Sequence, residues 1–177
     1  MINGDRVKQA REIRGWTQKL LADRIKIKQS AISQIESGIL SASDEIAERI
    51  VLQTGFPLSF LRESNSIDFP LGSLLYRGRQ SLTLRERSQA RQYARVIYEI
   101  IKKMSVSIGT IEHRIPRIEE NPVACAIQTR TALGLAPDTP IDNLIYTLEK
   151  NGCIVLGLPL NLEKLDAFSA WVGNDKR

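Results

Sequence analysis

The side chains that most often carry catalysis or bind a metal are scarce in this chain of 177 residues. It holds one histidine, His113, and two cysteines, Cys125 and Cys153. Zinc hydrolysis needs about three protein ligands and a general base, and a Cys or Ser nucleophile needs a histidine beside it. Both cysteines lie in apolar runs, which favour small core residues. Gly-rich phosphate-binding motifs are also missing from the sequence. We therefore predict no catalytic residue, no metal site, no cofactor and no enzyme activity.

A different chemistry is concentrated in residues 18–37, with the sequence QKLLADRIKIKQSAISQIES. The amide of a glutamine can bridge N6 and N7 of adenine in the major groove of DNA, where an α-helix fits. Serine and lysine side chains suit phosphates and smaller base contacts. A helix over 29–36 would display five such side chains outward: Lys28, Gln29, Ser30, Ser33 and Gln34.

Two helices that cross steeply over a short turn would present those side chains. The crossing needs a small residue in the first helix, and Ala22 is there. It also needs apolar anchors before, within and after the turn. Those anchors fit in register, and they are Leu21, Ile25, Ile27, Ile32 and Ile35. The alternative interpretation is an amphipathic helical hairpin that packs inside a core.

Residues 5–62 resemble an Xre/Cro-type helix-turn-helix domain, the five-helix fold of phage repressors. The resemblance implies a salt bridge between Arg11 and Glu36, and a phosphate contact by Gln18 next to the capping Thr17. It also places Gln29, Ser30, Ser33 and Gln34 at the family's base-reading positions. Two residues depart from the family pattern. Lys26 stands where the turn has glycine, which costs ~1 kcal/mol if the backbone there is left-handed, and Leu20 replaces a glutamate.

The first 62 residues predict five short helices as one domain. Asn3, Thr17 and Ser41 or Ser43 are favourable N-caps, and glycines follow several of the helix ends. The predicted helical ranges are 4–14, 17–25, 29–36, 44–54 and 58–62.

We interpret residues 63–82 as a linker. A long amphipathic helix follows over 83–108, and its apolar and basic pattern is strongest at about 83–104. Thr83 and Glu86 form a capping-box pattern at its start. Its apolar stripe runs from Ala90 to Met104, and it is either a dimer seam or a surface buried within its own chain. The opposite side is basic, and it either contacts phosphates or faces water; its residues are Arg87, Arg91, Arg95 and Lys102.

Residues 109–177 predict a small α+β segment, with helices at 122–133 and 140–151 and strands at 153–158 and 167–172. Over 83–173 the chain is similar to the approach to an ImmA/IrrE-type metallopeptidase domain. The His-Glu-x-x-His helix of that family would lie after the strand region, and the sequence ends at Arg177 before it. The expected fold class is therefore mainly α, with a lambda-repressor-like N-terminal domain, a long linking helix and a small α+β segment.

The charge distribution agrees with a polyanionic partner. Residues 1–38 hold eight Lys and Arg against four Asp and Glu, and residues 77–103 hold eight against two. Residues 104–177 hold seven against nine. No apolar run reaches the ~18 residues of a membrane span, and the N-terminus lacks a secretory pattern, so we expect a cytoplasmic protein.

The combined expectation is a sequence-specific DNA-binding transcription regulator, a repressor that binds double-stranded DNA as a homodimer. A protein partner could bind through residues 83–177. Two alternatives stay open: the front part of a DNA-binding zinc metallopeptidase regulator, and an antitoxin-type autoregulator.

Overall fold

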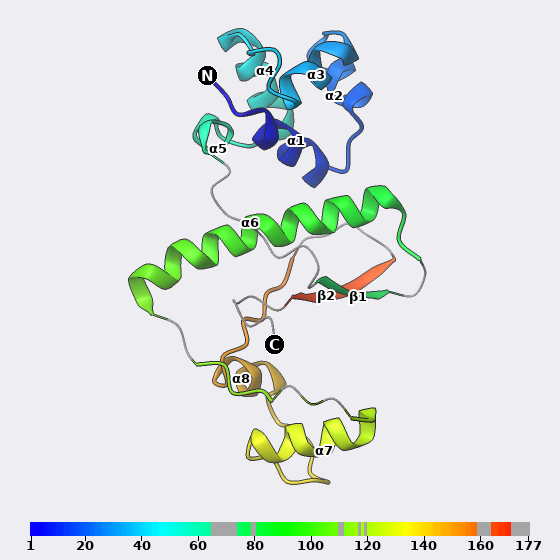
Figure 1. Ribbon diagram of the computed structural model, residues 1–177, viewed down its shortest axis with the longest axis vertical. Coiled ribbons are helices and arrows are strands. Elements are labelled where there is room, and N and C mark those ends of the chain that lie inside the picture. The colour runs from blue at the N-terminus through cyan, green and yellow to red at the C-terminus, as the bar shows by residue number, and fades with distance from the viewer. Residues whose placement is uncertain are drawn as a thin grey trace. The chain divides into compact units, whose positions relative to one another are not determined.

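The computed structural model describes residues 1–64, 74–78, 81–109, 112–116, 118, 120–158 and 164–170 (Figure 1). The fold is mainly helical with a small two-stranded sheet, as the sequence predicts. Two compact units divide the chain, one made of residues 1–100 and 160–177 and the other of residues 101–159. The helices of the first unit are α1 (Gly4–Ile13), α2 (Gln18–Ile25), α3 (Gln29–Glu36), α4 (Asp44–Thr54), α5 (Leu58–Arg62) and most of α6 (Leu84–Ile108).

Short polar side chains begin three of the first four helices. The side chains of Asn3, Thr17 and Ser43 accept hydrogen bonds from backbone N–H groups in the first turns of α1, α2 and α4. Of the two serines considered for α4, Ser43 is the cap. A cap satisfies a backbone N–H that has no partner within its helix, so these three starting points are fixed locally. The five predicted ranges of the first 62 residues agree with α1–α5 to within one residue at each end.

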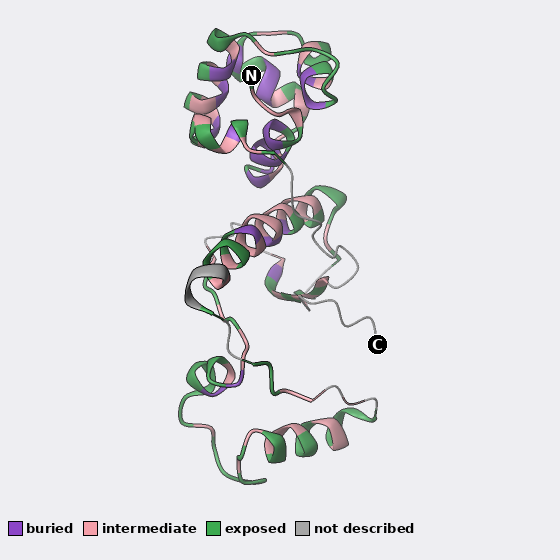
Figure 2. Cartoon of the chain, turned by 60° about the vertical axis from the view of Figure 1, so that its left-hand side comes forward, coloured by how far each residue is buried: buried purple, intermediate pink, exposed green. Residues whose placement is uncertain are grey.

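The core of this region is aliphatic and draws on all five helices (Figure 2). Leu61, on the short helix α5, is completely buried, and its carbonyl accepts a hydrogen bond from the N–H of Asn3 at 2.7 Å. The first and last turns of the region are thereby tied together. The buried apolar side chains are Val7, Ala10, Leu21, Ala22, Ile25, Ile32, Ile35, Ile50 and Leu61.

The predicted linker over 63–82 contains a strand, so that part of the prediction is wrong. Strand β1 (Leu74–Gly78) pairs antiparallel with β2 (Leu165–Ala170), with Tyr76 opposite Phe168. Residues 65–73 and 79–80 lie outside the described residues. A five-residue strand has little periodicity of its own, and the edge it pairs with lies far along the chain. The expected strand 167–172 begins at Leu165, and its last two residues are not described.

Helix α6 begins with the predicted capping box. The backbone N–H of Thr83 donates to Glu86 at 2.7 Å, and the N–H of Glu86 donates to the hydroxyl of Thr83 at 3.2 Å. The hydroxyl of Thr83 in turn donates to the same carboxylate oxygen of Glu86 at 2.8 Å. The two hydrogen bonds that this carboxylate accepts from Thr83, the backbone one first, lower the pKa of Glu86 below its ordinary value. Of the apolar stripe, Ala90 and Ala94 are buried in their own chain, whereas Ile100 and Met104 are half exposed. The dimer seam stays a prediction.

The second unit holds helices α7 (Pro122–Ala132) and α8 (Leu144–Glu149). Helix α8 begins after Asn143, whose side chain caps Tyr146, and not near Pro140 as the sequence indicated. The guanidinium of Arg130 donates hydrogen bonds to the carbonyls of Ala136 and Thr139, and these bonds hold the segment between α7 and α8 in a turn.

The strand expected over 153–158 is absent, because that segment is neither helix nor strand. Its β-branched residues favour an extended backbone, but a strand also needs a hydrogen-bonded neighbour. The backbone hydrogen bonds at the start of this segment are not those of a strand. The carbonyl of Leu148, in α8, accepts from the N–H of Cys153, and the carbonyl of Asn151, just after α8, accepts from the N–H of Arg114.

Candidate nucleic-acid interface

The turn between α2 and α3 has a left-handed residue at its start. Lys26 has φ 57° and ψ 49°, and it is the one residue other than glycine with positive φ among the described residues. The N–H of Ile27 then donates to the carbonyl of Ala22 at 3.0 Å. Ala22 is 1% exposed and lies in the aliphatic core, so its small side chain is buried where α2 and α3 cross. The turn keeps its geometry with lysine in the place of glycine, at a cost of ~1 kcal/mol.

Helix α3 has one buried side and one free side. Ile32 and Ile35 are buried in the core. Lys28, Gln29, Ser30 and Gln34 are exposed, and Ser33 is half buried. These are the five side chains that the sequence assigned to the outer surface of the helix.

A buried ion pair fixes the end of α3 against α1. The Nε of Arg11 donates to Oε1 of Glu36 at 2.6 Å, and its Nη2 donates to Oε2 of Glu36 at 2.9 Å. The Nη1 of Arg11 donates to the carbonyl of Trp16 at 2.7 Å, just before α2. A two-pronged pair of this kind sets orientation as well as distance. One guanidinium thus joins α1, the start of α2 and the end of α3.

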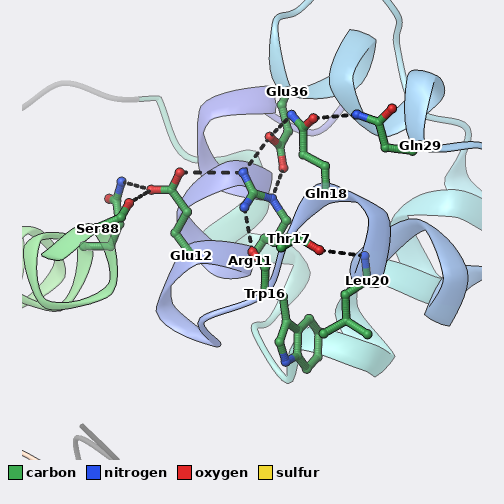
Figure 3. Close-up of polar contacts among 10 residues, drawn as sticks. Arg11, Glu12, Trp16, Thr17, Gln18, Leu20, Gln29, Glu36 and Ser88 are labelled. Carbon is green, nitrogen blue, oxygen red and sulfur yellow. Dashed lines mark hydrogen bonds and ion pairs between the residues drawn. The ribbon is translucent and has the colours of Figure 1, made fainter. Parts of the chain in front are cut away.

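Two glutamine amides continue this pair to the surface (Figure 3). The Nε2 of Gln18 donates to Oε2 of Glu36 at 2.9 Å, and the Nε2 of Gln29 donates to Oε1 of Gln18 at 2.8 Å. An ionised carboxylate only accepts hydrogen bonds, so Gln18 must turn its NH₂ group to Glu36 and its oxygen to Gln29. Gln29 must then turn its own NH₂ group inward. The buried charge of Glu36 therefore sets the orientation of an exposed amide on α3.

A shallow hollow lies beside Gln29, between α2 and α3. It contains two lysines and one aspartate, which gives it a positive balance. Its lining residues are Thr17, Gln18, Lys19, Asp23, Ile27, Lys28 and Gln29.

The comparison with protein families agrees with this geometry. Residues 7–61 match the family model described as "Helix-turn-helix". Residues 7–61 form a DNA-binding helix-turn-helix domain. No curated protein and no solved structure matches the chain. The resemblance of residues 83–173 to an ImmA/IrrE-type domain receives no support.

The sequence did not indicate Glu12 as part of the helix-turn-helix domain's polar framework. Its Oε1 lies 3.6 Å from Nη2 of Arg11, and its Oε2 accepts hydrogen bonds from α6. Nor did the sequence indicate Arg24, whose guanidinium lies 4.5 Å from the ring centre of Trp16. Neither contact has a sequence signal, because both depend on how separate elements pack.

The basic side of α6 is only partly free. Arg87, Arg91 and Lys102 are exposed, whereas Arg95 is half buried and its Nε lies 3.5 Å from Oε1 of Glu99.

Burial raises the pKa of the Cys153 thiol. Within the described ranges, no group of three or more His, Cys, Asp or Glu side chains could hold a metal ion. No described helix is both long and apolar enough to cross a membrane.

Proposed function

We propose that this protein is a sequence-specific transcription regulator, a repressor, that reads the major groove of DNA with helix α3. The observation that carries the proposal is the oriented amide of Gln29. An exposed glutamine usually samples many rotamers, and ordering it on DNA costs free energy. Here the bond to Gln18 orders the amide before DNA arrives.

The amide of Gln29 is suited to adenine in this orientation. One N–H of its Nε2 is used by Gln18, and the other is free to donate to N7 of adenine. Its Oε1 is free to accept from the N6 amino group, which completes the bidentate contact. Gln34, five residues further along α3 and also exposed, would read a neighbouring base pair.

Phosphate contacts would come from the surroundings of Gln29. Lys28 precedes α3, Ser30 and Ser33 lie on its outer side, and Gln18 lines the hollow beside them. Such contacts position the domain and make its affinity depend on salt, but they carry no sequence information.

A homodimer on a two-fold symmetric site is part of the proposal, since one module of this size binds weakly and paired half-sites multiply affinity. We propose that a protein partner would bind through residues 83–177, that the protein works in the cytoplasm, and that it has no catalytic activity. The peptidase and antitoxin alternatives gain no support from the family comparison.

Selection of bound duplexes from random DNA by the full chain is the direct test, because it reports binding, half-site spacing and symmetry together. We expect Gln29→Ala to cost ~1–3 kcal/mol on the selected site and to leave nonspecific affinity nearly intact. Gln128→Ala, at an exposed glutamine of α7, is the matched control and should bind as the unsubstituted chain does. Equal loss on all duplexes would refute the base-reading role of Gln29.

A further inference from the structure

We propose that Glu12 is a positioning residue that couples the docking of α6 to the reading of DNA by Gln29. The inference rests on the proposed function. Its basis is a continuous polar relay from α6 to the tip of α3, drawn in Figure 3. The relay consists of Ser88 and Gln92 of α6, Glu12 and Arg11 of α1, Glu36 of α3, Gln18 of α2 and Gln29 of α3.

Helix α6 meets the relay at one oxygen atom. The Oγ of Ser88 and the Nε2 of Gln92 both donate to Oε2 of Glu12 at 2.7 Å. The Oε1 of Gln92 is buried and has no hydrogen-bond partner among the described residues. Leaving a buried acceptor unpaired is costly, so the orientation of this amide is dictated by the carboxylate of Glu12.

Arg11 lies between two carboxylates that compete for it. Its guanidinium makes close hydrogen bonds to Glu36, at 2.6 and 2.9 Å, and a longer ion pair to Glu12 at 3.6 Å. While Ser88 and Gln92 occupy Glu12, much of its negative charge is satisfied by α6. Without them, Glu12 would draw Arg11 more strongly, and the pair between Arg11 and Glu36 would loosen.

Burial makes this competition effective. The side chains of Glu12, Arg11 and Glu36 are 15%, 9% and 4% exposed. Solvent and salt screen such charges far less than they screen charges on the surface. A shift of Arg11 toward Glu12 therefore changes how firmly Glu36 holds the amide of Gln18, and with it the preset orientation of Gln29.

Docking of α6 on α1 also uses contacts outside the relay. The Nε2 of Gln89 donates to the carbonyl of Ile13 at 2.8 Å, and Nη1 of Arg6 donates to Oε2 of Glu99 at 2.6 Å. Neither touches Glu12. Gln89 therefore offers a control variant on the same side of α6, which separates the relay from docking as such.

The experiment measures the ratio of affinities for a selected duplex and for an unrelated duplex, with the full chain. Replacing both donors, Ser88→Ala with Gln92→Ala, should lower this ratio about threefold to tenfold, the usual size of such coupling. Gln89→Ala should leave it within about twofold. Adding Glu12→Ala to the double variant should restore the ratio, because no competitor for Arg11 is left.

The side-chain ¹⁵N resonances of Gln18 and Gln29 provide a readout without DNA. We expect them to shift in the variant of Ser88 and Gln92 and to stay in place in Gln89→Ala, with native backbone spectra reporting folding. Unmoved resonances would overturn the relay, and so would an equal loss of the ratio in Gln89→Ala or a loss that Glu12→Ala leaves intact. If the unsubstituted chain selects no duplex, the proposed function fails, and the resonances alone decide the relay.

Discussion

The helix-turn-helix domain and residues 101–158 differ in what they bury. Nine apolar side chains form the core of the domain, from all five of its helices. Among the described residues of 101–158, only Thr147 and Asn151 are buried, and no large apolar side chain is. Figure 2 shows the contrast, with buried residues gathered in α1–α5 and none in α7.

Local signals nevertheless work in both regions. Asn121 caps α7 by accepting from the N–H of Ala124, as Thr17 caps α2 by accepting from the N–H of Leu20. Capping fixes where a helix begins, and a buried apolar face fixes where it lies. The helix-turn-helix domain has both caps and a buried apolar face, whereas residues 101–158 have mainly the caps. The same substitution should therefore have different consequences in the two regions.

The largest difference should come from placing a charge in each. Ala22→Glu puts a carboxylate into the tight crossing of α2 and α3, and we expect a loss of more than about 4 kcal/mol, enough to unfold the domain. Ala126→Glu, on the exposed surface of α7, should change stability by less than about 0.5 kcal/mol. Chemical denaturation of the two variants checks this, and a folded Ala22→Glu that binds DNA would contradict the register of the helix-turn-helix.

Removing apolar volume should give the next largest difference. Ile50 is completely buried, and Ile50→Ala should cost about 2–5 kcal/mol through lost contacts and a cavity. Ile127 is 53% exposed, and Ile127→Ala should cost less than about 1 kcal/mol. Similar losses at both positions would mean that α7 is packed as firmly as α4.

A smaller effect is expected at two left-handed positions. Lys26→Gly relieves backbone strain at φ 57° and should stabilise the domain by ~1 kcal/mol. Gly134 follows α7 at φ 69°, with open space around its missing side chain. Gly134→Lys should therefore introduce a strain of about the same size, ~1 kcal/mol. Thermal unfolding measures the first, and hydrogen exchange of α7 measures the second.

The smallest effect concerns the start of α6. The pKa of Glu86 is lowered by its bonds to Thr83. Because the pKa of Glu86 is lower in the folded state, its cap stabilises α6 fully at a pH above the unfolded-state pKa. This stabilisation is lost as the pH falls through the folded-state pKa. An NMR titration should show the carboxyl of Glu86 titrating below 4.5. Thr83→Ala removes the hydroxyl donor and keeps the backbone N–H, so it should bring the pKa of Glu86 only part of the way back toward that value. A Glu86 carboxyl that titrates at its ordinary value in the unsubstituted chain would refute the capping box.

Prediction from sequence succeeded where a feature depends on neighbours in the chain. The bounds of α1–α5, the capping box at Thr83 and the exposed side of α3 all follow from spacing and cap residues. It failed where the partner is remote. Strand β1 needs β2, the segment 153–158 lacks a neighbouring strand, and the carbonyls of Ala136 and Thr139, before α8, accept hydrogen bonds from Arg130 on α7.

The amino-acid sequence by itself determined the five N-terminal helices, the place of Ala22 in their crossing and the side chains that α3 turns outward. Periodicity and capping encode these within a few residues. Only the tertiary structure decided that Glu12 receives two donors from α6, that Arg11 lies between Glu12 and Glu36, and that Gln18 orients Gln29. Those contacts join residues from four helices, and the direction of each amide follows from a carboxylate that only folding brings near.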